Sequence, residues 1–286
     1  MGTADMTPLN AVRPLGPREF EQIRSLAHRA FGLDLKTGKE ELVSARLQRL
    51  VRDGGFRSFQ DYYRNILDDR TGVALARMID ALTTNHTAFL RESDHFDFLK
   101  ARAGELARRR RPLEVWSAAC STGEEVWSIG CALSEVLPTS QIHIWGTDIS
   151  NKVLRTAAAG LYPADRCCGL PASWLSHYFE AQDQRPEQYR VSAALRARVT
   201  FRRLNLVEPL AWPHCFPVIF CRNVMIYFDL ATQERVVRQL EHFLEPGGYL
   251  FIGHAESLTR LPHALEYVRP AIYRKPETKG DRCRRS

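Results

Sequence analysis

The pattern of apolar and polar positions divides the chain into a helical first part and an alternating second part. Apolar side chains recur at helical spacing over 16–84, which predicts a small N-terminal all-α domain. Short apolar runs then alternate with helical patterns over 112–275, which predicts an α/β domain with a Rossmann-like sheet. The residues between, 85–111, are predicted to be a connector that contains a helix. The stretch at about 160–200 is too long and irregular for one crossover helix, so it is predicted to be a small β-containing inserted subdomain.

One apolar run marks the centre of the predicted sheet. Val218–Cys221 shows no alternation, a pattern that is typical of a strand buried on both faces, as in a parallel sheet. The run ends at Arg222-Asn223, which cannot remain in an apolar core without partners. We therefore expect this polar pair at the carboxyl end of the strand, where open α/β sheets bind their ligands.

A second set of polar residues follows an earlier pair of predicted strands. Val115–Cys120 is predicted to be a buried strand, and it leads through the small-residue turn Ser121–Gly123 into a helix. The next strand, Ile142–Gly146, ends at Thr147-Asp148, where an acidic group can accept hydrogen bonds from ribose hydroxyls. The pattern therefore favours a nucleoside-type cofactor. The turn does not have the GxGxxG sequence, so the dinucleotide-binding fingerprint is absent.

Composition adds limits to this picture. With 286 residues, 44% of them hydrophobic and 26% charged, the chain has the composition of an ordinary globular protein with room for two domains. No apolar run approaches the roughly 18 residues that span a bilayer, and the first residues lack a signal-peptide layout. We expect a cytoplasmic protein with a flexible tail over 1–15 and a basic tail over 276–286. No HExxH or Cys/His ligand spacing occurs, so no metal site is predicted.

The formal net charge of +7 fits nucleic acid, an anionic surface or an acidic protein, and charge alone does not choose among them. Arg46, Arg49 and Arg52 recur every three residues along the helix predicted over Lys39–Asp53. Spacing alone favours a solvated helix face for this stripe. The functional alternative is a docking surface for an acidic partner.

Six strings in order along 16–275 resemble those of the chemotaxis receptor methyltransferases, which use S-adenosylmethionine to esterify glutamates of membrane receptors. They are NHTAFLRE (85–92), VWSAACSTGEE (115–125), GTDIS (146–150), LNL (204–206), CRNVMIYFD (221–229) and LEPGGYLFIGHAES (244–257). The resemblance implies S-adenosylmethionine as the methyl donor, S-adenosylhomocysteine as the product, and no metal. The cofactor contacts that it implies are Asn85, Thr87, Arg91, Glu125, Asp148, Asn205, Leu206, Arg222 and Asn223.

The resemblance also implies roles and a partner. Arg91 and Tyr227 are expected to align the donor and the substrate for methyl transfer. Arg46, Arg49 and Arg52 are expected to dock on the acidic helical bundle of a chemoreceptor. The resemblance therefore favours a docking surface over a solvated helix face for this stripe. Contact with the membrane would come only through that receptor. Some family members bind a receptor-tail pentapeptide through a glycine-bearing hairpin, but Glu180–Arg190 contains no glycine, so we do not expect this interaction here.

Two other functions fit parts of the sequence. The first is a catalytically idle regulatory module that binds S-adenosylmethionine and a signalling partner. The second is a nucleic-acid methyltransferase, which the basic charge would suit. The Cys221–Val224 string stands where amino-methylating enzymes of that class carry Asn/Asp-Pro-Pro-aromatic, and no base-stacking platform is evident, so nucleic acid is not the expected partner.

Overall fold

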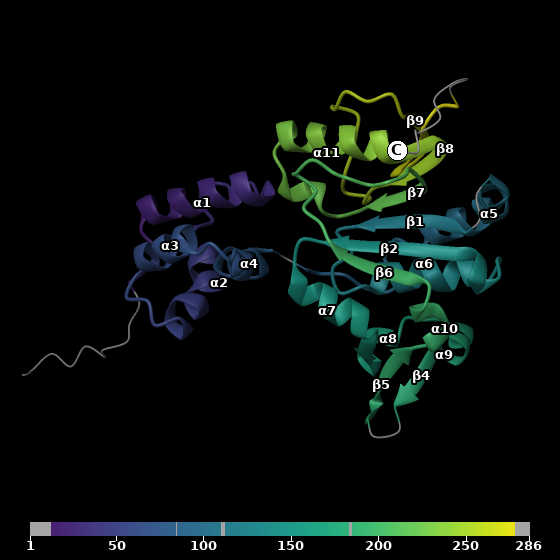
Figure 1. The fold of residues 1–286 in the computed structure, drawn as a ribbon, viewed down its shortest axis with the longest axis horizontal. Helices are drawn as coiled ribbons and strands as arrows, with labels where there is room; N and C mark the ends of the chain where they lie inside the picture. The colour runs from purple at the N-terminus through teal and green to yellow at the C-terminus, as the bar shows by residue number, and fades with distance from the viewer. Residues whose placement is uncertain (1–12, 84, 110–111, 183–184, 278–286) are drawn as a thin grey trace, which may run out of the picture. The chain divides into compact units, whose positions relative to one another are not determined.

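The computed structural model describes residues 13–83, 85–109, 112–182 and 185–277 (Figure 1). The chain divides into two compact units, one before and one after the boundary between residues 84 and 85. Apart from 13–15 and 276–277, the predicted N-terminal and C-terminal tails lie outside the described residues. No described helix has both the length and the apolar character that a membrane span requires.

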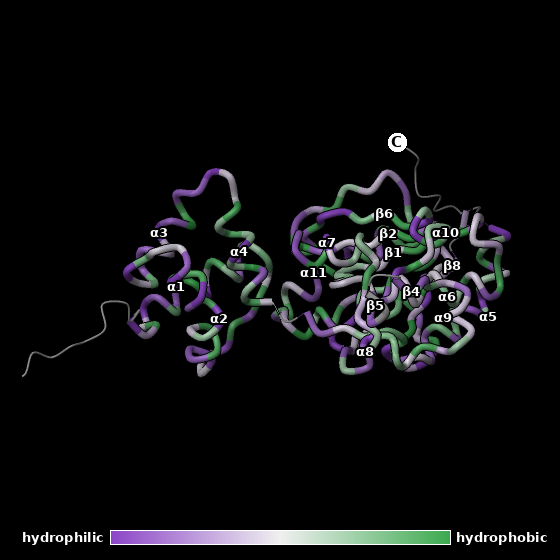
Figure 2. Tube along the Cα trace, turned by 90° about the horizontal axis from the view of Figure 1, so that it is seen from below, coloured by the Kyte–Doolittle hydropathy of each residue, from purple (hydrophilic) through white to green (hydrophobic). Residues whose placement is uncertain are grey.

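The first unit is a small all-α domain. Each helix buries one apolar face, and Figure 2 shows hydrophobic and hydrophilic segments mixed along all of them. Pro17 occupies the first turn of the first helix, and the Ser58 hydroxyl caps the third by accepting from the backbone N–H of Asp61 at 3.1 Å. The helices are α1 (Pro17–Phe31), α2 (Glu40–Asp53), α3 (Phe59–Asp68) and α4 (Val73–Leu82).

The second unit is built on a seven-stranded sheet with the order β6-β2-β1-β7-β8-β10-β9. The five strands from β6 to β8 are parallel, and β10 and β9 are antiparallel additions at one edge. In chain order the strands are β1 (Leu113–Ala118), β2 (Ile142–Asp148), β6 (Val199–Arg203), β7 (Phe216–Cys221), β8 (Leu244–Phe251), β9 (Glu266–Arg269) and β10 (Ile272–Arg274).

Helices cover both faces of this sheet, as Figure 1 shows. The prediction of a central strand buried on both sides is confirmed by β7, in which all six residues are buried. Val218 and Phe220 pack into the core beneath α5 and α6, whereas Ile219 and Cys221 pack into the core beneath α11. The helices of this unit's main body are α5 (Asp94–Arg109), α6 (Glu124–Ser134), α7 (Asn151–Ala159) and α11 (Leu230–Phe243), with short 3-10 helices η1 (Thr139–Gln141) and η2 (Met225–Tyr227).

An inserted subdomain with its own small sheet separates α7 from β6. Its antiparallel strands have the order β3-β5-β4, so β3 and β4 form the two edges. Short helices flank the strands. The elements are β3 (Leu161–Pro163), α8 (Ala164–Cys167), α9 (Ala172–Tyr178), β4 (Phe179–Gln182), β5 (Arg185–Val191) and α10 (Ala193–Arg196).

The end of the sheet differs from the sequence prediction. The sequence pattern predicts a single edge strand over Tyr267–Tyr273, because Pro270 would be poorly tolerated in the middle of a sheet. The structure instead has two antiparallel strands, β9 and β10, joined by a turn at Pro270-Ala271 in which Ala271 adopts a φ of 61°. The proline removes a ladder donor and therefore ends β9 instead of lying within a longer strand.

Candidate functional site

The candidate site lies at the carboxyl edge of the parallel strands. From β1 the chain builds outward through β2 to β6, and it then returns to place β7 on the other side of β1. The order of strands therefore reverses between β1 and β7, and such a switch point opens a crevice outside the carboxyl ends of the two strands. The predicted polar residues after β1, β2, β6 and β7 all belong to this edge.

Backbone strain concentrates at the same edge. Among the described residues, the non-glycine positions with positive φ include Leu90 and Glu92 in the connector, Ala119 and Ser121 after β1, and Asn223 after β7. Left-handed conformations at ordinary residues are costly and occur most often at functional sites. The fold therefore holds the backbone of this edge in strained conformations.

Glycine is required once in the turn after β1. Gly123 has a φ of 96°, and a Cβ there would lie 2.7 Å from the Cβ of Ala157 in α7. The absence of a side chain lets α7 pack closely against the start of α6, which begins at Glu124, directly after this turn. Glu124 itself is fully buried and pairs with Arg166 of α8, a long-range contact that the local pattern does not contain.

Asp148 links three segments of the edge. Its carboxylate accepts from the backbone N–H groups of Ser121 and Ser150, each at 2.9 Å, and its own carbonyl accepts from the N–H of Leu204 at 3.0 Å. The Ser121 hydroxyl in turn donates to the carbonyl of Asn85 at 3.1 Å. The structure thus brings Asp148, Asn85 and the segment that leads to Asn205 together.

Arg222 is the centre of a buried ion-pair network. Only 5% of the residue is exposed, and its guanidinium donates to Glu92 at 2.8 Å, to Glu125 at 3.1 Å and to the carbonyl of Arg91 at 2.5 Å. Glu125 also accepts from the hydroxyl of Ser117 in β1 at 2.7 Å. The network ties the connector, the start of α6 and the end of β7 to one another, and it holds Glu125 in a fixed orientation.

The two carboxylates of this network have opposite pKa shifts. Burial raises the pKa of both, but the hydrogen bonds and charge of Arg222, together with Asn223, outweigh burial at Glu92 and leave its pKa below the ordinary value. At Glu125 burial dominates over Arg222 and Ser117, and the pKa lies above the ordinary value. A further positively charged group near Glu125 would therefore stabilise its ionised form.

Three residues that the sequence reasoning did not single out support this edge: Glu92, Glu256 and His95. Glu256 accepts from four backbone N–H groups after β7 and β8, those of Asn223, Met225, Ile226 and Gly253. It thereby fixes the left-handed turn at Asn223 and the start of η2. Glu92 and Glu256 both lie within strings quoted for the resemblance, which was the available signal.

His95, in the first turn of α5, is fully buried beside this network. Burial, aided by the positive charge of Arg222, lowers the pKa of His95 to about 4. The ring is therefore neutral at pH 7. Its position in the E-x-x-H spacing Glu92-Ser93-Asp94-His95 was the available sequence signal.

Of the two predicted alignment residues, Arg91 contacts the network and Tyr227 lies in η2. The half-buried Arg91 side chain donates to the carbonyl of His86 at 3.1 Å, and its backbone is bound by Arg222. Tyr227 ends η2 and is half-buried, next to the exposed Ile226. Thr87 is held through its carbonyl, which accepts from Arg166 at 3.2 Å.

Two predicted cofactor contacts, Asn205 and Leu206, follow β6. Asn205 donates to Glu208 at 2.9 Å, and its side-chain oxygen accepts from the N–H of Val207 at 3.3 Å, which forms a compact turn. Leu206 is 7% exposed and packs in the core beneath α11, and its carbonyl accepts from Gln239 at 3.0 Å. Leu206 is therefore mainly a core residue, and Asn205 is the polar group of this segment.

The basic stripe on α2 does not present three equivalent side chains. Arg46 is half-buried and donates to the carbonyl of Leu82 at the end of α4. Arg49 and Arg52 have side chains that are 83% and 63% exposed and lie near Asp53. The accessible part of the stripe therefore consists of Arg49 and Arg52.

Comparison with known families decides the identity of the fold. The model for "CheR methyltransferase, SAM binding domain" matches residues 85–273, and that for "CheR methyltransferase, all-alpha domain" matches residues 18–83. The chain belongs to the CheR methyltransferase family. The predicted resemblance and the predicted fold, an all-α domain before a Rossmann-like methyltransferase sheet, are thereby confirmed.

Relatives of the CheR methyltransferase family match along most of their length. A "Chemotaxis protein methyltransferase" of Klebsiella aerogenes is 40% identical over 255 residues, covering 87% of this chain and 86% of the relative. That of Borreliella burgdorferi is 37% identical over 270 residues, covering 90% and 94%. That of Escherichia coli is 36% identical over 264 residues, covering 91% of each.

The family match covers the whole candidate edge. The SAM binding domain, 85–273, begins at Asn85 and includes every predicted cofactor contact. The chain is therefore a methyltransferase with an S-adenosylmethionine-binding domain, and Glu125, Asp148 and Arg222 lie at the carboxyl edge of its parallel strands.

Proposed function

We propose that this chain transfers the methyl group of S-adenosylmethionine to glutamate side chains of chemoreceptors during chemotaxis adaptation. The products would be glutamyl methyl esters and S-adenosylhomocysteine. The observation that carries the proposal is the network around Arg222, which holds the Glu125 carboxylate, with a side chain 13% exposed, at the switch point of a SAM binding domain. The three relatives described above bear the name chemotaxis protein methyltransferase, and none is named as a regulatory module, so the idle alternative is not favoured.

The proposed donor contacts follow from charge and position. Glu125 would accept from the methionine ammonium, because burial raises the pKa of Glu125 and a further positive charge would stabilise its ionised form. Arg91 would bind the methionine carboxylate with charge-assisted hydrogen bonds. Asp148 would accept from the ribose hydroxyls, because it ends β2 at the carboxyl edge of the sheet, where an acidic group can meet a ribose.

We also assign a role to each of the remaining predicted cofactor contacts. Asn205 would meet the polar edge of the adenine, with Leu206 beneath it. Asn85 and Thr87 would border the donor from the connector, whose carbonyl groups are already anchored to Ser121 and Arg166. Arg222 and Asn223 would act mainly by holding Glu125 and Glu92, because their side chains are occupied by these carboxylates.

The proposed reaction requires little acid–base chemistry. The bound donor supplies an electrophilic methyl on a sulfonium, and a receptor glutamate with a reference pKa of about 4.3 is already an anion at neutral pH. One carboxylate oxygen forms the new O–CH3 bond as the S–CH3 bond breaks. The protein must align the anion behind the methyl and exclude water. We assign this alignment to Arg91 and Tyr227.

The function is tested directly by mapping products. Receptor-containing membranes would be incubated with the chain and S-adenosylmethionine carrying a labelled methyl, and receptor peptides would then be examined by mass spectrometry. Labelled methyl esters on glutamates are expected. Label on lysine, on nucleic acid or on no macromolecule would contradict the proposal.

We further propose that the exposed arginines of α2 dock on the acidic receptor bundle. The double change Arg49→Glu and Arg52→Glu should raise the KM for receptor about tenfold or more while leaving kcat nearly unchanged, because several weak ion pairs become repulsions. Initial rates at increasing receptor concentration measure this effect, which should shrink as salt is added.

A matched control is available on α1 of the same unit. Arg18 and Arg29 are also exposed, and changing both to glutamate alters the net charge by the same amount. The control should keep the KM of the unchanged chain. Equal effects of the two double variants would show a general charge effect and would remove the docking role of α2.

The inserted subdomain is not proposed to bind a receptor-tail pentapeptide. Its β4-β5 hairpin contains no glycine over Glu180–Arg190, although β3 and β4 are edge strands of the small sheet. The absence of pentapeptide binding stays a prediction.

A further inference from the structure

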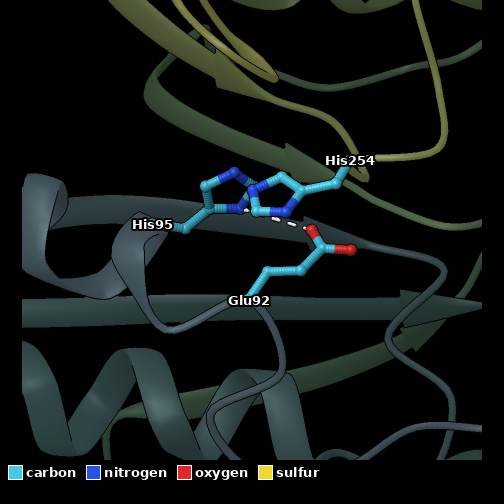
Figure 3. Close-up of side chains that lie close together, drawn as sticks. All are labelled: Glu92, His95 and His254. Atoms are coloured by element: carbon cyan, nitrogen blue, oxygen red, sulfur yellow. Dashed lines mark ion pairs between the residues drawn. The ribbon is translucent and has the colours of Figure 1, made fainter.

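Three side chains with metal-ligating groups converge beside the Arg222 network. Glu92 and His95 stand three residues apart at the start of α5, and His254 follows the end of β8 (Figure 3). One ligand atom from each lies within 4.8 Å of the others. We call this group the Glu92–His95–His254 cluster. The spacing between its parts in sequence explains why no linear metal motif was found.

His95 is the member that points to a missing partner. The residue is fully buried, and neither ring nitrogen has a hydrogen-bond partner within the described part of the chain. Its Nδ1 lies 3.8 Å from a Glu92 carboxylate oxygen, which is too long for a hydrogen bond. A buried polar group without a partner costs about 1–3 kcal/mol, and native proteins keep few of them. An ion held between His95 and Glu92 would give this ring a partner.

The surroundings of the cluster resemble the outer shell of a metal site. Metal-binding carboxylates are usually hydrogen-bonded, and metal-binding histidines usually direct their second nitrogen to a carboxylate. Glu92 accepts from Arg222 at 2.8 Å and from Asn223 at 3.3 Å. His254 places Nε2 3.3 Å from a carboxylate oxygen of Asp94. Both outer ligands are therefore oriented by groups that would not themselves bind the ion.

The local charge also suits a divalent cation. Glu92, Glu125 and Asp94 carry three negative charges near the cluster, and Arg222 offsets one of them. The contact with Arg222 does not use up Glu92, because each carboxylate oxygen has two lone pairs. A doubly charged ion would neutralise the two remaining negative charges and offset the free-energy cost of burying these groups.

We propose that Glu92, His95 and His254 bind a divalent transition-metal ion of the zinc class. Two imidazoles and one carboxylate form a known zinc ligand set that leaves a fourth position for water. Bonds of 2.0–2.1 Å place tetrahedral ligand atoms about 3.3 Å apart, so the cluster would contract on binding. His254, whose side chain is 44% exposed, is the member free to move inward.

The consequence of occupancy would be mechanical. The ion would join the start of α5 to the end of β8, and Glu92 would carry this link to Arg222 and Asn223 at the candidate site. The proposal does not depend on the identity of the methyl acceptor. Bound metal should therefore raise the melting temperature, and more so at higher metal concentration, whether or not a receptor is present.

The test uses the full chain without an affinity tag, titrated with Co²⁺ and with Zn²⁺ by calorimetry. One equivalent should bind, and His254→Ala should weaken binding at least tenfold, since an entire ligand is lost. His254 is substantially exposed, so the variant should keep its fold, which the melting curve without metal verifies. His177→Ala, which removes an exposed histidine of α9, is the matched control and should bind as the unchanged chain does.

The absorption spectrum of the Co²⁺ form separates this site from the free thiols. Nitrogen and oxygen ligands give only weak visible bands, whereas binding at the exposed Cys168 would add a strong near-ultraviolet thiolate band. The absence of saturable binding, a thiolate band from the bound equivalent, or equal affinity in His254→Ala and His177→Ala would each overturn the proposal.

Discussion

Replacement of Arg222 by methionine should lower the free energy of unfolding of the second unit by about 3–5 kcal/mol. Methionine fills a similar volume but leaves Glu92 and Glu125 buried without their shared cation, and uncompensated buried charges have costs of this size. The carbonyl of Arg91 also loses its donor. Calorimetric melting without ligand measures the effect.

Two controls separate the ion-pair network from arginine loss in general. Arg238→Met removes the exposed partner of Glu234 and should cost no more than about 1 kcal/mol. The triple variant Arg222→Met, Glu92→Gln and Glu125→Gln removes the buried charges together and should recover most of the lost stability. A small effect of Arg222→Met, or no recovery in the triple variant, would show that the network is not what holds this edge.

Replacement of Arg91 by alanine should reduce kcat/KM for methyl transfer about 10–100-fold with the fold intact. A hydrogen bond to a charged group contributes about 1.5–3 kcal/mol, and the side chain's described contact within the protein is one bond to the His86 carbonyl. The affinity for S-adenosylhomocysteine should fall by a similar factor, because the proposed partner is the methionine carboxylate. Steady-state rates and calorimetry measure the two effects.

Arg196→Ala is a matched control, because this arginine also donates to a backbone carbonyl, that of Val191 at 3.0 Å. It lies in the inserted subdomain and should leave the rate almost unchanged. Tyr227→Phe, which removes one hydroxyl, should reduce kcat without weakening donor binding. Unchanged rates in both Arg91→Ala and Tyr227→Phe would remove their proposed role in alignment.

Periodicity predicted the parts of the fold in which local pattern and burial coincide. The unbroken apolar run at Val218–Cys221 identified the central strand, because only a strand covered on both faces needs two apolar sides. The polar pair Arg222-Asn223 that follows this run indicated the carboxyl edge of the sheet, because such a pair cannot remain in an apolar core without partners. The sequence also placed Asp148 at a strand end, where the structure finds it bound to the turn after β1.

The local sequence pattern could not predict contacts between segments that lie far apart in the chain. Arg222 meets Glu92 across 130 residues, and Glu256 supports the turn at Asn223 from 33 residues away. Nothing in the local composition of the connector distinguishes Glu92, which is buried by the network, from an ordinary exposed glutamate. The same holds for Arg46, whose place in a regular basic stripe gave no sign of its contact with the Leu82 carbonyl.

The central claim is that the crevice between β1 and β7 binds the methyl donor, and titration of the purified chain with S-adenosylmethionine and S-adenosylhomocysteine tests it most directly. Calorimetry should show one saturable site for each compound, with weaker binding in Arg91→Ala. No detectable affinity for either compound in the folded chain would contradict the account.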